Sequence, residues 1–433
     1  MDRRRGGHPG APLGTGRSLN ATVPPAAARA LDETLNSVIT WIDPGDGAGH
    51  GPLGGLRLGL KDNIDTAGIL TTCASAFFHE RVPEADAEVV ERLRAAGATI
   101  TAKLNMAEFA VGVTSQNSAY GGCRNPWDPQ RIPGGSSGGS GVAVAAGLVD
   151  AALGTDTGGS VRLPAAMCGV SGLRPTVGRI STAGVFPVST VVDTVGPMAR
   201  TVADLARLFA VLARSHQPAR PAIGRLGIPT HFFTDGVDPG VRAVVAAAAS
   251  DLGALGMDLV RVTLPGVDTA QDAVYTLVYS ELSELHRDRL RSEPDRFHPD
   301  TLARVRLGLS LTKDDRTRAL RARASFQAAL DDLFTEVDAI LTPTMPIDVP
   351  RRGGGDVIAV ARHLGRFTYP WSLHTGPTLA LPVGSHPDSG MPVGAQLTAA
   401  AGQEDVLLTL GAAYQERTRW HRRRPPSSLE GML

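Results

Sequence analysis

The chain has 433 residues, 42% of them hydrophobic and 20% charged, so it is long enough to bury a large core. Its 43 basic and 43 acidic residues give a formal net charge of zero, which argues against nucleic acid or an anionic membrane surface as a direct partner. Three cysteines without a CxxC pair argue against a disulfide framework and a zinc site. These features are typical of a cytoplasmic protein, and we expect neither a cofactor nor a metal.

The beginning of the chain is irregular. Residues 1–25 are rich in Gly, Pro, Arg and Ala without a period, which predicts a disordered tail. No repeat or linker divides the rest of the chain, so we expect one large domain over 26–425. The spacing of apolar residues predicts a helix over 27–41, and the period-2 pattern of 56–60 predicts a strand that ends at Lys61.

Beyond Lys61 the chain alternates between helical and strand patterns. The expected helices cover residues 86–96, 142–148, 201–213, 241–255 and 403–415, and 271–336 is mostly helical. The expected strands cover residues 99–104, 151–154, 222–228, 259–262, 339–341 and 378–383. This alternation predicts an α/β fold, with one mixed, twisted sheet covered by helices on both faces.

Two Gly/Ser segments flank the helix expected at 142–148: residues 135–139 (GSSGG) and residues 158–160 (GGS). Glycine lets a ligand approach the backbone N–H groups closely, and serine adds a hydroxyl. A flexible linker is the less favoured interpretation, because the apolar run 142–153 is suited to packing inside a protein. We therefore expect an active site, with both segments at one edge of the sheet.

Ser160 is the candidate nucleophile. A hydrolase needs a nucleophile, a base and donors for an oxyanion. The residues before Ser160, 157–159, offer backbone N–H groups with little side-chain bulk. A structural turn would explain the glycines, but not the charged residues Asp156 and Arg162 on either side of Ser160.

Lys61 is the candidate base. Only three of the 43 basic residues are lysines, and none of the eleven histidines lies in either Gly/Ser segment. A lysine in a dry site loses its proton more easily, because burial disfavours the ammonium, whereas an arginine stays charged. A neutral Lys61 amine could then accept the proton of a serine.

Three motifs carry a resemblance to a known family. They are GLKDNID at 59–65, PGGSSGGS at 133–140 and GTDTGGSVR at 154–162, and Ser136 precedes Ser160 by 24 residues. In this order and spacing they resemble the lysine, serine-glycine and nucleophile motifs of the amidase signature hydrolases. The similar core covers about 55–200, and smaller similarities lie at 105–109, 125–128, 172–176, 196–200, 341–344 and 392–397.

The resemblance implies hydrolysis of an amide to an acid and ammonia or an amine. It implies that Ser160 attacks the carbonyl, that Ser136, preceded by a cis peptide bond, relays the proton, and that Lys61 is the final base. The oxyanion would be held by the N–H groups of Thr157, Gly158, Gly159 and Ser160.

The resemblance also implies supporting roles around the catalytic residues. Ser137 is expected to support them without reacting, and Arg162 is expected to form an ion pair, with Asp156 beside the nucleophile. The acyl pocket is expected from segments that vary within the family, near Ala110 and within 271–312 and 363–378.

Other functions remain open on the sequence alone. Residues 135–139 also match the G-x-S-x-G nucleophile elbow with Ser137 at its centre, although the three prolines in 125–133 leave no strand before it. A tRNA-dependent amidotransferase subunit that uses glutamine is similar up to Pro175, but Arg366 stands near the position where those subunits have an acidic residue. Allophanate-type ureido substrates and a non-enzymatic relative are further alternatives. The expected partner is a small amide, and a homodimer is open.

Overall fold

The computed structural model describes residues 25–43, 49–213, 223–353 and 355–428. Within them, eleven strands form one mixed sheet in the order β1-β3-β2-β4-β6-β5-β10-β11-β9-β7-β8. The strands are β1 (Val38–Trp41), β2 (Arg57–Lys61), β3 (Thr99–Leu104), β4 (Ala151–Asp156), β5 (Ser171–Arg174), β6 (Thr194–Ala199), β7 (Arg225–Pro229), β8 (Asp258–Val262), β9 (Ala339–Pro343), β10 (Thr378–Ser385) and β11 (Pro392–Thr398). The tail expected at 1–25 lies outside the described residues, apart from Pro25.

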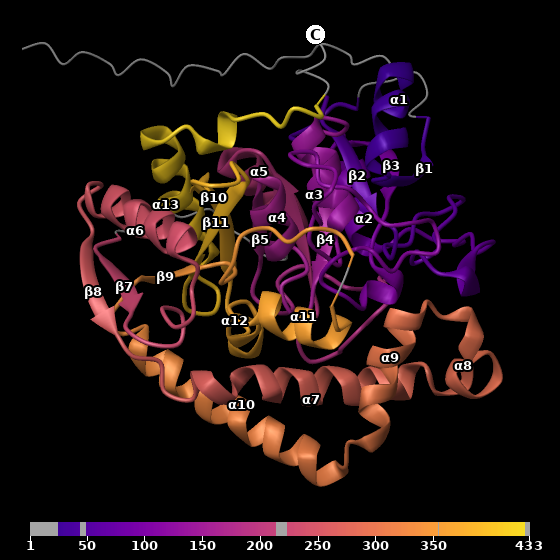
Figure 1. Cartoon of the computed structure of the whole chain (residues 1–433). Coiled ribbons are helices and arrows are strands. Elements are labelled where there is room, and N and C mark those ends of the chain that lie inside the picture. The colour runs from indigo at the N-terminus through magenta and orange to yellow at the C-terminus, as the bar shows by residue number, and fades with distance from the viewer. Residues whose placement is uncertain (1–24, 44–48, 214–222, 354, 429–433) are drawn as a thin grey trace, which may run out of the picture.

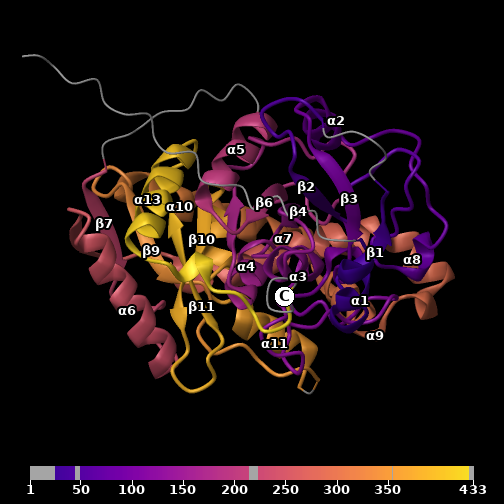
Figure 2. The ribbon, with the colours of Figure 1, turned by 90° about the horizontal axis from the view of Figure 1, so that it is seen from above.

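Helices cover both faces of this sheet, as the two views in Figure 1 and Figure 2 show. The helices are α1 (Pro25–Leu35), α2 (Glu88–Ala95), α3 (Gly138–Ala146), α4 (Arg162–Cys168), α5 (Val202–Leu212), α6 (Pro239–Gly253), α7 (Val267–Leu285), α8 (Arg287–Ser292), α9 (Pro299–Leu307), α10 (Lys313–Leu333), α11 (Val357–Gly365), α12 (Tyr369–His374) and α13 (Glu404–Arg417). One face carries α1, α3 and α4, and the other carries α2, α5, α6 and α13. The long helices α7 and α10 pack side by side below the sheet in Figure 1, against α12.

The sheet separates two layers of apolar core because neighbouring residues of a strand point to opposite faces. On β4, Ala152 belongs to the cluster beneath α3 and α4, whereas Leu153 belongs to the larger cluster on the other face. Every residue of α3 is buried, as expected of a helix built only from small and apolar residues. This helix brings the first Gly/Ser segment against the centre of the sheet.

The helix expected over 27–41 is shorter than predicted. It ends at Leu35, and Val38–Trp41 forms strand β1. The Asp32 carboxylate accepts hydrogen bonds from the N–H groups of Ser37 and Val38, and Asn36 has a φ of 54°. These interactions turn the chain out of the helix, and the β-branched and aromatic residues that come next favour a strand.

The expectation that both Gly/Ser segments lie at one edge of the sheet is wrong. The second segment follows β4, which has β2 on one side and β6 on the other. Strands β5, β6 and β11 were not predicted, and they place β4 in the interior of the sheet. The prediction that Lys61 ends a strand is confirmed, since it is the last residue of β2.

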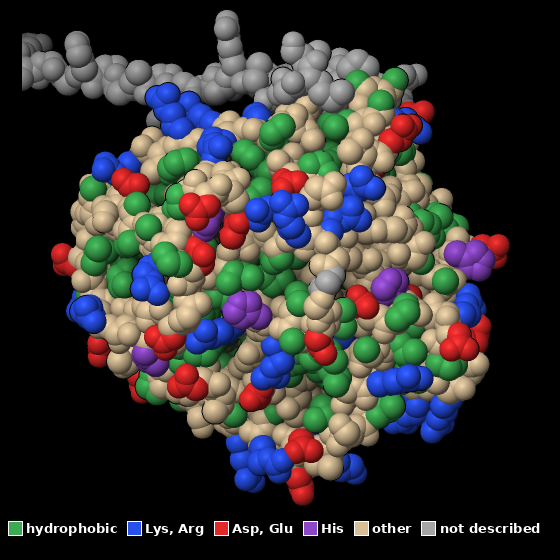
Figure 3. Space-filling model, viewed as in Figure 1, with side chains coloured by type: hydrophobic (Ala, Val, Ile, Leu, Met, Phe, Trp, Pro, Cys, Tyr) green, Lys and Arg blue, Asp and Glu red, His purple; other side chains and the backbone are tan. Residues whose placement is uncertain are grey.

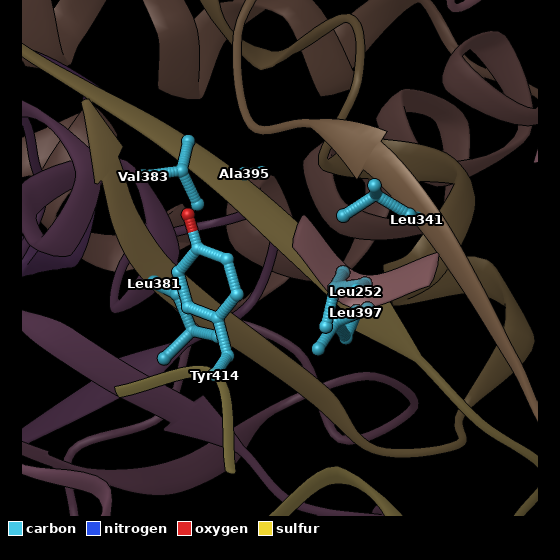
Figure 4. Close-up of a pocket in the computed structure, with 7 residues that line it drawn as sticks. All are labelled: Leu252, Leu341, Leu381, Val383, Ala395, Leu397 and Tyr414. Atoms are coloured by element: carbon cyan, nitrogen blue, oxygen red, sulfur yellow. The ribbon is translucent and has the colours of Figure 1, made fainter. Parts of the chain in front are cut away.

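An apolar cavity lies between the sheet and helices α6 and α13 (Figure 4). It is lined by Leu252, Leu341, Leu381, Val383, Ala395, Leu397 and Tyr414. None of the residues predicted for the active site is among them, so this cavity belongs to the packing of the core.

The surface mixes charges of both signs. On the face shown in Figure 3, Lys and Arg side chains are interspersed with Asp and Glu among apolar atoms. None of the described helices is both long and apolar enough to cross a membrane.

Candidate active site

The carboxyl ends of β2 and β4 bring Lys61 to the middle of the molecule. The two strands are parallel, with Leu60 opposite Leu153, so their ends meet on the same side of the sheet. There the Lys61 side chain is fully buried. Its Nζ lies 2.6 Å from Ser136 Oγ and 2.7 Å from Thr155 Oγ1. The first contact joins two residues that the sequence pointed to, and Thr155 is a partner that sequence analysis missed.

Burial is the main influence on the charge of Lys61. It lowers the pKa of Lys61 to about 7, although the carboxylates of Asp156 and Asp193 raise that pKa in part. A large fraction of the amine is therefore neutral at neutral pH. Of the other two lysines, Lys103 is also buried but donates to Ile64 O and Thr71 Oγ1 on a neighbouring loop.

The first Gly/Ser segment contacts both the lysine motif at 59–65 and the motif at 154–162. The peptide bond between Gly135 and Ser136 is cis. The Ser137 hydroxyl donates to Thr155 O at 3.2 Å and accepts from Thr155 N–H at 3.3 Å. The Ser137 N–H donates to Ser160 O at 3.2 Å. Ser137 therefore joins β4 to the second Gly/Ser segment, and its hydroxyl contacts Thr155 and not Lys61.

The second Gly/Ser segment turns sharply between β4 and α4. Gly159 has a φ of 128°, which residues with a side chain rarely adopt. A Cβ on Gly158 would lie 2.4 Å from the Tyr369 ring. The N–H of Gly159 donates to Asp156 Oδ1 at 2.8 Å, so this predicted oxyanion donor is occupied. Within the described residues, the N–H groups of Gly158 and Ser160 have no hydrogen-bond partner.

Asp156 is held by two arginines below this turn. Its Oδ1 accepts from Arg162 Nη2 at 2.9 Å and from Arg174 Nη1 at 3.1 Å, and all three side chains are fully buried. Burial raises the pKa of Asp156, but the two guanidinium groups outweigh burial and hold the pKa well below its usual range. Arg162 also donates to Thr368 O and Ser372 Oγ. Arg162 thus fixes the second Gly/Ser segment to α12 and the residue before it.

Asp193 is a second carboxylate, partly buried, that sequence analysis missed. It lies in the loop before β6, and its Oδ1 accepts from Thr157 Oγ1 at 2.6 Å. An acidic residue inside the otherwise apolar run VVDTV, residues 191–195, was the available signal. The side chain of Thr157 therefore has a partner of its own. The sequence predicted only that the backbone N–H of Thr157 would bind the oxyanion.

A pocket opens beside Ser160. Its lining residues are Ala110, Val111, Gly112, Val113, Thr157, Gly158, Ser160, Val188, Val278, Tyr279, Leu282 and Tyr369. The segments near Ala110 and within 271–312 and 363–378, expected to form the acyl pocket, all contribute to this wall. Residue 188 is the contribution that was not foreseen.

The two serines expected to be catalytic differ in exposure. Ser136 is fully buried, whereas Ser160 is 8% exposed and faces the pocket. Within the described residues no hydrogen bond joins the two hydroxyls, and such contacts commonly tighten only when substrate binds. The described residues contain no group of three or more His, Cys, Asp or Glu side chains that could hold a metal.

Comparison with known proteins assigns the family. The family model described as Amidase matches residues 25–408, which is most of the chain. The chain belongs to the amidase signature family. Members of this family are amidohydrolases that act on C–N amide bonds, so the resemblance found in the motifs is confirmed.

Individual relatives of this amidase have several names. It is 39% identical to a glutamyl-tRNA(Gln) amidotransferase subunit from Chloroflexus aurantiacus, over 92% of this chain and 88% of that protein. A solved glutamyl-tRNA(Gln) amidotransferase subunit from Thermotoga maritima has a TM-score of 0.84 and 28% identity, with 93% of each chain covered. A 6-aminohexanoate cyclic dimer hydrolase solved with its substrate has a TM-score of 0.84 and 30% identity, covering 93% of this chain and 94% of that one.

Proposed function

We propose that this amidase hydrolyses a carboxylic acid amide to the acid and ammonia or an amine, through an acyl-enzyme on Ser160. The observation that carries this proposal is the hydrogen bond between the fully buried Lys61 and Ser136. Burial favours a neutral amine there, and a neutral amine can accept a proton from a serine.

In the acylation step, Ser160 Oγ attacks the amide carbonyl carbon. Its proton passes to Ser136 as the Ser136 proton passes to Lys61 Nζ. The carbonyl oxygen becomes an oxyanion, which the N–H groups of Gly158 and Ser160, unpartnered among the described residues, would stabilise. The ammonium of Lys61 then returns the proton through Ser136 to the leaving nitrogen, and the C–N bond breaks.

In the deacylation step, water replaces the leaving amine. Water attacks the acyl carbon while its proton passes through Ser136 to Lys61. The intermediate collapses, Ser160 regains a proton by the reverse path, and the acid leaves. Lys61 therefore has to gain and lose one proton in each half of the reaction.

The charges around Lys61 favour its neutral form in the resting enzyme. The fully buried carboxylate of Asp156 and the partly buried carboxylate of Asp193 lie with two fully buried guanidinium groups, those of Arg162 and Arg174. Their charges balance without Lys61, so an ammonium at Lys61 adds a surplus positive charge to a buried site.

Ammonia release by the purified chain alone tests this function. The panel should include aliphatic, aromatic and ureido amides, with the Ser160→Ala variant as the control. We expect release of ammonia and acid in equal amounts from at least one neutral amide, and none from the variant. Release that persists in the Ser160→Ala variant would contradict the proposal.

A glutamine-using amidotransferase subunit is the second candidate, because the relatives of this amidase include proteins of that name. Against it, Arg366 stands near the position where glutamine-using subunits have an acidic residue. Its guanidinium donates to Asp235 O and Phe232 O and is not part of the pocket wall. Ammonia release from glutamine that requires tRNA and a co-purified partner would favour this candidate over a free-standing amidase.

A further inference from the structure

We propose that Asp193 is a positioning residue of this site, which joins the turn before Ser160 to the pocket wall and contributes to the charges that act on Lys61. The inference rests on the proposed roles of Lys61 and Ser160. Asp193 lies outside all three motifs and outside the wall of the pocket, so it has no contact with the reacting atoms.

The carboxylate of Asp193 bridges two segments that are distant in sequence. One oxygen accepts from the Thr157 hydroxyl at 2.6 Å. The other accepts from the N–H groups of Val188 at 2.8 Å and Ser189 at 2.9 Å. Thr157 begins the turn that leads to Ser160, and Val188 lines the pocket. One side chain therefore sets the distance between the nucleophile turn and the facing wall.

The Asp193 carboxylate has fewer charged partners than the Asp156 carboxylate. Asp156 has ion pairs with two arginines, whereas Asp193 has none among the described residues. Its three closest partners are the neutral donors of Thr157, Val188 and Ser189, with the charge of Arg174 acting at longer range. Burial raises the pKa of Asp193, and the three donors and the charge of Arg174 offset this rise in part by favouring the ionised form.

Three groups that could carry a negative charge influence the pKa of Lys61: Asp156 at the end of β4, Asp193 before β6 and the thiol of Cys73. Burial raises the pKa of the Cys73 thiol, so it is neutral. Asp156 raises the pKa of Lys61 more than Asp193 does, and an ionised Asp193 adds to this stabilisation of the ammonium when Lys61 gains a proton. Asp193 therefore has two effects: it positions the turn before Ser160, and its charge acts on Lys61.

Two variants separate these effects. Asp193→Asn removes the charge and at least one acceptor, and Thr157→Val removes only the hydrogen bond to Oδ1. For Asp193→Asn we expect the plateau of kcat/KM to fall at least about tenfold and the acid limb of the pH profile to move down by about one pH unit, because the ammonium of Lys61 loses part of its counter-charge. For Thr157→Val we expect a lower plateau with an unchanged acid limb.

Controls keep the inference separate from the proposed function. Asp204→Asn, at the start of α5 and away from the site, should leave the profile of the wild type. If Ser160→Ala and Lys61→Met lose activity while Asp193→Asn keeps the wild-type plateau and acid limb, the inference about Asp193 is wrong and the proposed function stands. If Ser160→Ala and Lys61→Met stay active, the proposed function itself is wrong.

The inference about Asp193 can still be tested if Asp193→Asn does not fold. Thr157→Val then tests the bridge through the rate at which a fluorophosphonate labels Ser160. We expect this rate to fall at least about tenfold, because a small displacement of the nucleophile is costly. A labelling rate equal to that of the wild type would overturn the positioning role.

Discussion

Lys61 Nζ and Ser136 Oγ lie 2.6 Å apart in a fully buried environment. The lysine comes from the end of β2, and the serine comes from the turn before α3, 75 residues further along the chain. Because burial favours the neutral amine and this contact aims it at the serine hydroxyl, we expect Lys61 to be the proton acceptor for Ser136.

Replacing Lys61 should abolish hydrolysis. For Lys61→Met we expect kcat/KM to fall by about 10³-fold or more, because methionine has similar length but cannot accept a proton. Steady-state ammonia release measures this change. Lys313→Met, at the exposed start of α10, is the matched control and should behave as the wild type. If Lys61→Met kept most of its activity, the nucleophile-elbow interpretation centred on Ser137 would be favoured instead.

The pH dependence should have an acid limb near neutrality. Burial lowers the pKa of Lys61 to about 7, so the ammonium predominates below pH 7 and the neutral base predominates above it. We therefore expect kcat/KM to rise with pH through 7 and to level off above about pH 8. The substrate should have no titratable group in this range. A profile that falls with rising pH between 6 and 8 is incompatible with a neutral Lys61 as the base.

The sequence predicted which residues of the candidate site meet better than it predicted the arrangement of the sheet. Lys61, Ser136 and Ser160 could be singled out because they lie in compact motifs, and rare lysines are conspicuous in an arginine-rich chain. Asp193 and Thr155 were missed because their roles depend on contacts between segments, Thr157 with Asp193 and Lys61 with Thr155. Nothing local to either residue specifies its partner.

The fold was likewise predicted only where local sequence determines the structure. Strand β2 and helix α5 could be predicted because local spacing of apolar residues determines them. Strands β5 and β11 were missed: β5 has only four residues, and both are stabilised by antiparallel pairing with β10. The helix expected over 27–41 was too long because the capping contacts of Asp32 with Ser37 are not visible in a periodic pattern.

Gly158 should not tolerate a side chain. A Cβ there would lie 2.4 Å from Tyr369 Cε1, so Gly158→Ala should displace either the ring or the turn that holds Ser160. We expect at least a tenfold loss of kcat/KM with little change in thermal stability. Gly224→Ala is the control, because nothing lies within 4 Å of a Cβ at that position. Equal activity of the two variants would show that the turn is less tightly held than this contact implies.

Asp156 should be important for stability as well as for the turn. Asp156→Asn leaves Arg162 and Arg174 buried without their carboxylate, and removing one partner of a buried ion pair costs about 3–5 kcal/mol. We expect a fall of this size in the free energy of unfolding, measured by urea denaturation. Asp258→Asn, an exposed position at the start of β8, should change it by less than about 0.5 kcal/mol. A loss of activity without a loss of stability would assign Asp156 a different role.

Mass spectrometry of the acyl-enzyme tests the central proposal most directly. A reaction quenched during turnover of an amide or an activated ester, then digested, should carry the acyl group on the peptide that contains Ser160. The adduct should be absent from Ser160→Ala and should accumulate more slowly in Lys61→Met. An adduct on Ser137, or rapid turnover by the wild type without any adduct on Ser160, would contradict the proposed nucleophile.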